Sequence, residues 1–199
     1  MNKKSPYVDK NFEGLFWNLA DNWLPILDLN EYKNKPIKYL EIGALYGANL
    51  LSVAALYGLH DETKLYCIDP WIDYNDYPEY KGKQNTIFQT FTNNIDASEH
   101  RDKITVIRGF SNEEVPQLQN EFFDIIYIDG NHEPEYVLED AVLCFRKLKK
   151  GGILIFDDYG WGGPDLTQRG IDAFVSGYHK KIKVLGFQGM QVFIKKLDI

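Results

Sequence analysis

A strand that breaks into a glycine turn and opens directly into a helix most constrains the fold of this 199-residue chain. It lies at Lys38–Asn49, with the sequence KYLEIGALYGAN. Glu41 ends the apolar segment, and Gly43 and Gly47 stand in the turn. Glycines at such a turn let backbone amides approach a ligand closely, beside the positive end of the helix dipole. We therefore predict a ligand site at the end of this strand.

The rest of the chain repeats this alternation. Strands are predicted at residues 37–42, 65–69, 104–108, 123–129 and 152–157, and helices at 47–57, 83–96 and 134–149. A helix at Gly170–Tyr178 precedes two strands, KIKVLGF and MQVFIKKL, joined by a tight Gln188-Gly189 turn. The pattern predicts a Rossmann-like, doubly wound α/β sheet of seven strands, mostly parallel with a C-terminal antiparallel hairpin. Ligands of such sheets bind at the carboxyl ends of the strands.

We predict one domain over residues 1–199, with a helical extension at 1–36 and a catalytic core at 37–199. Within the extension, apolar side chains at helical spacing over residues 11–29 favour an amphipathic helix or helix pair: Phe12, Leu15, Phe16, Leu19, Trp23 and Leu24. The start of the sequence, MNKKSPYVDKNF, lacks the apolar segment of a signal peptide, so we expect a cytoplasmic location.

Composition and charge exclude several classes of partner. A net charge of −7 argues against sequence-independent binding to nucleic acid or to an anionic membrane. The longest near-apolar run, Leu50–Leu59, is far too short for a membrane span. Cys67 and Cys144 lie inside apolar runs and are predicted to be buried thiols.

The helix predicted at 134–149 has residues at both ends that are typical of helix termini. Pro134 suits a first turn, and Lys147, Lys149 and Lys150 would lie at the negative end of the helix dipole. Gly151-Gly152 would stop the helix. We therefore interpret this basic run as a helix terminus rather than as a phosphate site.

A carboxylate follows the second predicted strand. Asp69 lies 26 residues after Gly43, in KLYCIDPW. In an open α/β sheet this position faces the ribose of a bound nucleoside, and a carboxylate there accepts from both hydroxyls. The alternative is that Asp-Pro only starts a turn.

Two further strands end in acids. DIIYIDGNH gives Asp129 and His132, and GGILIFDDYGWGG gives Asp157 and Asp158. Neighbouring strands lie about 4.8 Å apart, so these carboxylates can share one cation. Oxygen ligands without cysteine favour Mg²⁺ or a similar divalent ion. Asp157 and Asp158 converge only if the strand ends there; otherwise one caps a loop and the other alone binds metal or substrate.

The glycine turn resembles the first motif of the class I S-adenosyl-L-methionine (SAM) methyltransferases. The run FDIIYIDGNHEPEYVLEDAVLCFRKLKKGGILIFDDY is similar to the metal-dependent enzymes of that class that methylate sugar hydroxyls of macrolide and aminocoumarin antibiotics, and more distantly to catechol-type O-methyltransferases. This resemblance implies that Asp129, Asp157 and Asp158 hold Mg²⁺ and that His132 is the base. Some relatives place an acid two residues after the first, where this chain has Asn131.

The same resemblance implies a set of cofactor contacts. The segment Gly109–Ser111 would pack on the adenine, although Ser111 with Glu114 also fits a helix capping box. The full predicted set for SAM is Glu41, Gly43, Tyr46, Gly47, Asn49, Asp69, Gly109, Phe110, Ser111 and Asp129. Tyr46 and Asn49 would contact the methionine end, or else act as a packed ring and a local cap.

The acceptor is expected to be a small hydroxylated molecule, a sugar or glycoside. Aromatic rings pack well on sugar faces, and the predicted substrate contacts are Trp71, Tyr80, Tyr159 and Trp161. The segment Trp71–Tyr80 forms either a lid or a surface loop against the body or a second subunit, which leaves a homo-oligomer open. Alternative functions are a phenol O-methyltransferase, a non-catalytic module and an NAD-type oxidoreductase. The missing Gly-x-Gly-x-x-Gly speaks against the last.

Overall fold

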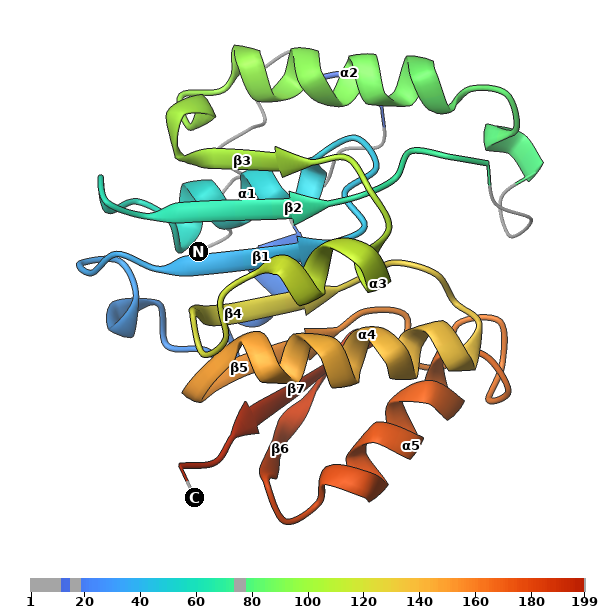
Figure 1. Cartoon of the computed structure of the whole chain (residues 1–199). Coiled ribbons are helices and arrows are strands. Elements are labelled where there is room, and N and C mark those ends of the chain that lie inside the picture. Colours follow the sequence, from blue (N-terminus) through green and yellow to red (C-terminus); the bar gives the residue numbers. More distant parts are fainter. Residues whose placement is uncertain (1–11, 15–18, 74–77, 199) are drawn as a thin grey trace.

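A computed structural model describes residues 12–14, 19–73 and 78–198. Its centre is a seven-stranded sheet in the order β3-β2-β1-β4-β5-β7-β6 (Figure 1). Strands β1 to β5 run parallel, and β7 is antiparallel to both β5 and β6. The predicted Rossmann-like sheet with its C-terminal hairpin is confirmed.

The strand bounds are β1 Lys38–Ile42, β2 Lys64–Ile68, β3 Ile104–Ile107, β4 Phe123–Ile128, β5 Leu148–Phe156, β6 Ile182–Gln188 and β7 Gln191–Lys196. The α-helices are α1 Ala48–Leu56, α2 Gln84–Ala97, α3 Ser111–Glu114, α4 Pro134–Lys147 and α5 Thr167–Tyr178. Short 3-10 helices are η1 Leu19–Trp23, η2 Leu29–Glu31, η3 Pro78–Tyr80, η4 Arg101–Lys103 and η5 Val115–Gln117.

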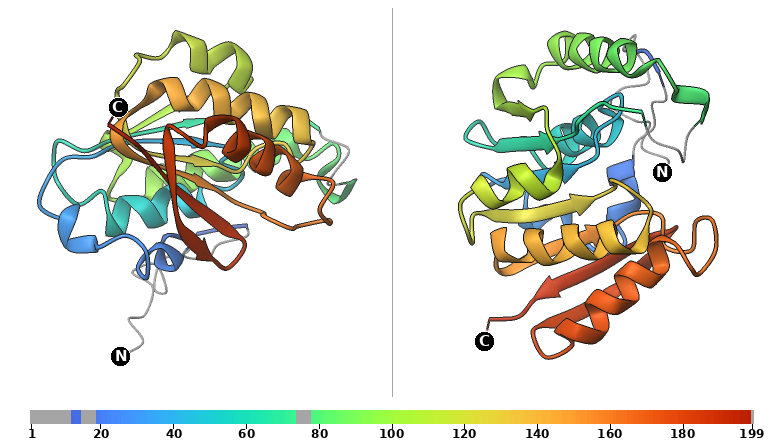
Figure 2. Two further views of the ribbon diagram at one scale, coloured as in Figure 1. Left: turned by 90° about the horizontal axis from the view of Figure 1, so that it is seen from below. Right: turned by 45° about the vertical axis from the view of Figure 1, so that its right-hand side comes forward.

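Each face of the sheet packs against its own layer of helices (Figures 1 and 2). On one face, side chains of η1, α1 and α2 join odd-numbered strand residues such as Tyr39 and Tyr127 in a first core cluster. On the other face, α4 and α5 cover Leu40, Ile42 and Ile126 in a second cluster. Alternation along β1 and β4 thus places neighbouring residues in different cores, as expected for a sheet that is buried on both sides.

The register of the sheet aligns the ends of its central strands. Ile42 of β1 pairs with both Ile68 of β2 and Ile128 of β4, and Ile128 pairs with Phe156 of β5. The next residues, which are Gly43, Asp69, Asp129 and Asp157, therefore leave the sheet at one level. This edge carries the candidate site.

Two local predictions are wrong. The helix α4 ends at Lys147, and Lys149 and Lys150 already belong to β5. Lys147 is buried and donates to the backbone oxygens of Pro116 and Leu118, while Lys149 pairs with Asp124 at 2.6 Å. Lys147 therefore satisfies backbone acceptors, and Lys149 pairs with an acid near the start of β4. Gly151 and Gly152 lie within β5 and do not stop the helix.

The hairpin turn is also displaced by one residue, because Gln188 pairs with Gln191 and leaves Gly189-Met190 as the loop. At the N-terminus, where an amphipathic helix or helix pair is predicted, the described residues form the short 3-10 helices η1 and η2, one on each side of Pro25. Trp23 is fully buried between Tyr39, Tyr57 and Tyr127. Leu15 and Phe16 lie outside the described residues. Cys67 and Cys144 are buried free thiols, as predicted.

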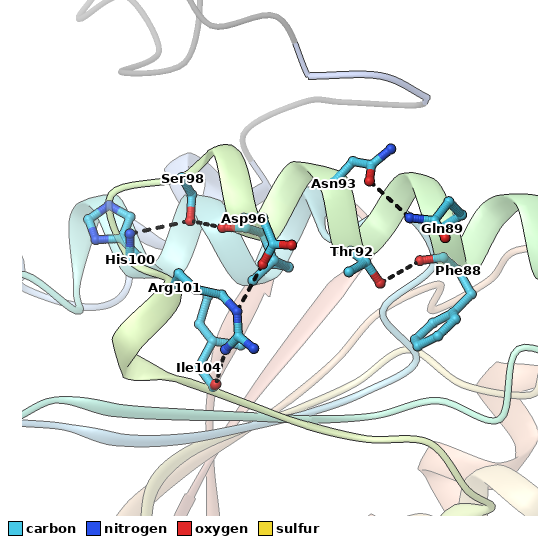
Figure 3. Close-up of polar contacts among 10 residues, drawn as sticks. Phe88, Gln89, Thr92, Asn93, Asp96, Ser98, His100, Arg101 and Ile104 are labelled. Atoms are coloured by element: carbon cyan, nitrogen blue, oxygen red, sulfur yellow. Dashed lines mark hydrogen bonds and ion pairs between the residues drawn. The ribbon is translucent and has the colours of Figure 1, made fainter.

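Helix α2 lies at the β3 end of the sheet and presents a polar outer side (Figure 3). Its C-terminal end is tied to the next strand by Arg101, which bonds Asp96 at 3.0 Å and the carbonyl of Ile104 at 3.3 Å. These contacts fix the return of the chain into β3. Within the described part of the chain, no helix has the length and apolar character needed to cross a membrane.

Candidate active site

The glycine bend after β1 is tight. Gly43 and Gly47 have φ angles of 82° and 86°, in the left-handed region that favours glycine. A Cβ on Gly43 would lie 1.9 Å from the carbonyl oxygen of Asp129. The bend of β1 therefore packs directly against the end of β4, and a side chain at this position has no room.

Asp69 fixes the shape of that bend. Its Oδ2 accepts from the backbone N–H groups of Ala44 at 2.9 Å and Leu45 at 3.0 Å, and its Oδ1 accepts from Trp71 at 2.7 Å. Asp69 therefore has a structural role in the turn. A carboxylate offers about four acceptor positions, so a ribose hydroxyl can still be accommodated. The ribose contact stays a prediction.

Glu41 lies on the α1 side of the sheet, away from the bend. Its carboxylate accepts from the hydroxyl of Tyr39 at 2.5 Å and from the amide of Asn49 at 2.9 Å. Burial raises the pKa of Glu41 to about 8, although both hydrogen bonds oppose the shift. Glu41 and Asn49 therefore join β1 to α1. Tyr46 meets the ring of Tyr80 edge-on, with 6.4 Å between the ring centroids.

A cavity of about 460 Å³ opens at the carboxyl ends of β1, β2 and β4. Its apolar walls are Ile42, Ile68, Pro70, Ile72 and Phe110, and its polar lining comprises Ser111, Asn112, Glu113, Asn131, Tyr136, Glu139 and Asp140, with Gly43 and Gly130. Of the predicted cofactor residues, it brings together Gly43, Phe110 and Ser111. Its described lining contains three acids and no lysine or arginine.

Ser111 has a different local role from the one its sequence context suggests. It is the first residue of α3, and Phe110 occupies the N-cap position, so the capping-box prediction is wrong. The hydroxyl of Ser111 instead acts on the carboxyl of Asp140 on α4, whose pKa it lowers. Gly109 does not line the cavity; its N–H donates to the carbonyl of Asp69 at 3.3 Å.

The acid cluster lies beside this cavity. Ligand atoms of Asp129, His132 and Asp158 all lie within 4.8 Å of one another. The strand β5 ends at Phe156, and Asp158 has a φ of 59°, which turns its side chain toward Asp129. Nε2 of His132 lies 3.1 Å from Oδ2 of Asp158. These groups line a second cavity of about 10 Å³, close to the room that one water molecule or ion needs.

Asp157 lines the same small cavity, but its carboxylate already accepts hydrogen bonds from the protein. The hydroxyl of Tyr127 donates to its carboxylate, and Nε2 of Gln191 donates to that hydroxyl at 3.0 Å. Its Oδ1 also accepts from the backbone N–H of Asp158 at 2.9 Å. Asp157 is thus in the cluster's wall, whereas the three groups that converge most closely are Asp129, His132 and Asp158.

The electrostatics of the cluster are unfavourable without a counter-charge. Burial raises the pKa of Asp129 well above its usual range, and the carboxylates of Asp157 and Asp158 raise it further. Burial also raises the pKa of Asp157, although the Tyr127 hydroxyl lowers it in part. A bound cation or proton would relieve this repulsion. Gly130 and Asn131 line both cavities, so the acids and the larger cavity are adjacent.

The four aromatic residues predicted to contact the substrate do not lie together in the structure. The ring of Trp161 lies 4.5 Å from that of His132 and shields it. Trp71 is buried among Phe88 and Phe91, with a φ of 44°, and does not line either cavity. Tyr80 packs on Tyr46.

Tyr159 packs on Phe187 and donates to Asp172. Residues 74–77 of the predicted lid lie outside the described residues.

Sequence reasoning missed Asp140, Tyr127 and Gln191. Asp140 falls on the apolar stripe of a helix, where a carboxyl is unusual, and this misfit was a usable signal. Tyr127 and Gln191 gave none, because a tyrosine in a strand and a glutamine after a turn are both ordinary.

Comparison with known proteins agrees with this geometry. Residues 40–159, more than half of the chain, match a family described as a methyltransferase domain. Protein R132 of Acanthamoeba polyphaga mimivirus, itself uncharacterized, is 27% identical over 162 residues. The match covers 79% of this chain and 66% of the viral protein, just under two thirds of its length.

Three solved structures share the fold. A putative rRNA-methylase from Clostridium thermocellum has a TM-score of 0.67 at 14% identity, over 94% of this chain and 99% of that one. The O-methyltransferase TomG of Streptomyces achromogenes, involved in tomaymycin synthesis and solved with SAM, scores 0.65 at 16% identity, over 89% and 80%. MycE, from the mycinamycin biosynthetic pathway and solved with Mg and S-adenosylhomocysteine, scores 0.59 at 17% identity, over 92% and 55%.

At these identities the structural likeness establishes the fold. The predicted resemblance to class I enzymes is confirmed by the family match and by this fold. The chain belongs to the family described as a methyltransferase domain, and it has the fold of solved methyltransferases.

Proposed function

We propose that this protein is a SAM-dependent, divalent-metal-dependent O-methyltransferase whose acceptor is a hydroxyl of a small molecule, a sugar or glycoside. The observation that carries the proposal is the convergence of Asp129, His132 and Asp158 within 4.8 Å, next to a cavity large enough for a nucleoside. TomG and MycE, which share the fold, are described with SAM and with Mg and S-adenosylhomocysteine respectively.

The charge of the larger cavity favours SAM over a dinucleotide. SAM carries a sulfonium and an ammonium group, whereas NAD carries a pyrophosphate. The described lining offers Glu113, Glu139 and Asp140 and no cationic side chain. A pyrophosphate there would face like charge without a basic partner, which costs binding free energy.

The donor set fits a divalent cation. Two carboxylates and an imidazole surround a space of about 10 Å³, and burial together with the carboxylates of Asp157 and Asp158 raises the pKa of Asp129. Asp129 and Asp158 would hold the cation, with Asp157 or His132 completing the set. The imidazole among the donors admits Mn²⁺ or Zn²⁺ besides Mg²⁺. A cation held there supplies positive charge that makes a nearby hydroxyl more acidic.

His132 would take the proton of the acceptor hydroxyl. Its Nε2 points at Asp158, whose carboxylate at 3.1 Å would stabilise the imidazolium that forms. Methyl transfer would form a bond between the acceptor oxygen and the methyl carbon and break the bond from that carbon to sulfur, with S-adenosylhomocysteine as the second product. A positioned base of this kind contributes roughly 10²–10⁴-fold to the rate.

The proposal of a small acceptor rests on the net charge of the chain and on the aromatic ring beside His132. The chain has a net charge of −7, and the ring of Trp161 lies over His132, where a sugar face could pack. A phenol would pack equally well on such a ring, so the choice between a sugar and a phenol is part of the test. An RNA acceptor would need basic surface near the cavity.

Calorimetry with three ligands tests the proposal. We expect the protein to bind S-adenosylhomocysteine and Mg²⁺ or Mn²⁺, and to bind NAD⁺ weakly or not at all. NAD⁺ binding alone would overturn it, and binding of S-adenosylhomocysteine without any divalent ion would indicate a metal-free transferase or a non-catalytic module. A mass-shift screen with SAM against sugars, glycosides, phenols and a structured RNA then identifies the acceptor.

A further inference from the structure

Asp140 is a buried carboxyl with no part in the mechanism above. It lies on α4 with 4% of its surface exposed, and it nevertheless lines the 460 Å³ cavity. A Cβ placed on Gly130 would lie 3.3 Å from its Oδ2, so the carboxylate lies where α4 meets the end of β4. Its position at the cavity wall suggests a contact with the cavity's occupant.

Among the described residues, the protein satisfies little of the hydrogen-bonding capacity of this carboxylate. The hydroxyl of Ser111 lowers its pKa, while a carboxylate accepts about four hydrogen bonds. Burial raises the pKa of Asp140 to about 7, and the neighbouring Glu139 adds to the shift. A ligand that brings an N–H donor would complete the acceptor and offset part of the cost of burial.

The walls around Asp140 suit a flat base. Pro70, Ile72 and Phe110 supply apolar surface from the ends of β2 and β3. The reacting methyl must lie near Asp129 and His132, so the nucleoside occupies the part of the cavity farther from the acid cluster, along these walls. An adenine there would turn an edge toward the floor formed by Gly130 and Asp140.

We infer that Asp140 recognises the adenine of the cofactor by accepting a hydrogen bond from its exocyclic amine. This inference rests on the proposed use of SAM and adds the residue that reads the base. It makes Asp140 a specificity-determining residue for the cofactor.

The test compares two ligands in calorimetry: S-adenosylhomocysteine and its 6-deamino analogue, in which hydrogen replaces the exocyclic amine. The wild-type protein should prefer the amine by about 10- to 100-fold, the range of a hydrogen bond to a charged acceptor. In Asp140→Asn, which keeps an oxygen acceptor for Ser111, the preference should shrink, and in Asp140→Ala it should fall below about 3-fold. Affinity for the deamino analogue should change little in either variant.

Glu135→Gln is the matched control, because Glu135 is an exposed carboxyl on the same helix that lines neither cavity; it should keep the wild-type preference. Thermal unfolding verifies that each variant is folded. Equal losses of affinity for both ligands, or an unchanged preference in Asp140→Ala, would overturn the inference. A wild-type protein that binds neither ligand would instead contradict the proposed use of SAM.

Discussion

Two aspartates at the same edge of the sheet are used in opposite ways. Asp69 follows β2 and Asp129 follows β4, and both of these strands pair with β1. Asp69 is surrounded by three backbone N–H groups, whereas Asp129 faces the carboxylates of Asp157 and Asp158. The Asp69 carboxylate accepts hydrogen bonds from backbone donors, whereas the Asp129 carboxylate lies near groups of the same charge.

The difference shows that burial alone does not mark a functional acid. Burial raises the pKa of both groups, but backbone donors lower that of Asp69 while like charges raise that of Asp129 further. A carboxylate whose partners are already in the protein stabilises the fold. A carboxylate crowded by others costs folding free energy until a cation arrives, and such a cost is typical of functional sites.

The largest expected effect is that of Asp129→Asn. Removing this ligand should weaken binding of Mg²⁺ or Mn²⁺ by at least about 100-fold and abolish metal-stimulated methyl transfer. The variant without metal should unfold at a higher temperature than the wild type at pH 8, because the repulsion with Asp157 and Asp158 is relieved. Calorimetric metal titration and thermal unfolding measure the two effects.

Asp165→Asn is the control, because Asp165 is an exposed acid in the loop that also carries Asp158. Unchanged metal affinity in Asp129→Asn would remove Asp129 from the site, and a lower unfolding temperature at pH 8 would contradict the comparison with Asp69.

His132→Gln should lower turnover by roughly 10²-fold, since the base is lost. Metal and S-adenosylhomocysteine affinities should stay within about 3-fold if His132 acts as the base alone. Calorimetry and initial rates separate these quantities, and His179→Gln, at the exposed histidine that follows the C-terminal end of α5, serves as control. A large loss of metal affinity would reassign His132 as a ligand.

Asp69→Asn should destabilise the protein by about 1–3 kcal/mol, because the amide cannot satisfy all three backbone donors. S-adenosylhomocysteine should bind more weakly in consequence, since the bend loses its fixed shape. Denaturant unfolding and calorimetry check both. Asp73→Asn is the control: Asp73 accepts from Gly82 but is exposed. A stability equal to that of the wild type would show that Asp69 does not fix the bend.

The smallest effect is that of Glu41→Gln. The pKa of Glu41 is about 8 in the folded protein against an ordinary value of 4.5, so its ionisation opposes folding. That cost is absent below about pH 4.5 and grows up to about pH 8. The variant should therefore be more stable than the wild type at pH 8, by about 1 kcal/mol, because neutral hydrogen bonds to Tyr39 and Asn49 offset part of the gain.

Unfolding temperatures from pH 5 to pH 8.5 would measure this difference, which should shrink as the pH falls. Parallel curves for the variant and the wild type would show that Glu41 does not titrate with a raised pKa.

Much of the fold could be read from the chain. Strong periodicity and glycine punctuation located all seven strands to within a few residues, and Gly43 and Gly47 marked the bend. The errors fell where a side chain had a distant partner. Lys147 and Lys149 fitted a helix end by local charge, but Pro116, Leu118 and Asp124 accept their hydrogen bonds across the fold. Ser111 fitted an N-cap by residue type, but the helix begins one residue earlier than that prediction, with Phe110 at the N-cap position.

By itself, the sequence determined which strands end in acids and glycines, because periodicity and turn residues act over a few positions along the chain. Only the tertiary structure decided which of those groups meet. Whether Asp158 turns toward Asp129, whether Asp69 meets backbone donors and whether Trp71 is buried all depend on distances of a few ångströms between segments far apart in sequence. Hydrogen bonding and charge repulsion act over those distances, and the packing of the sheet sets them.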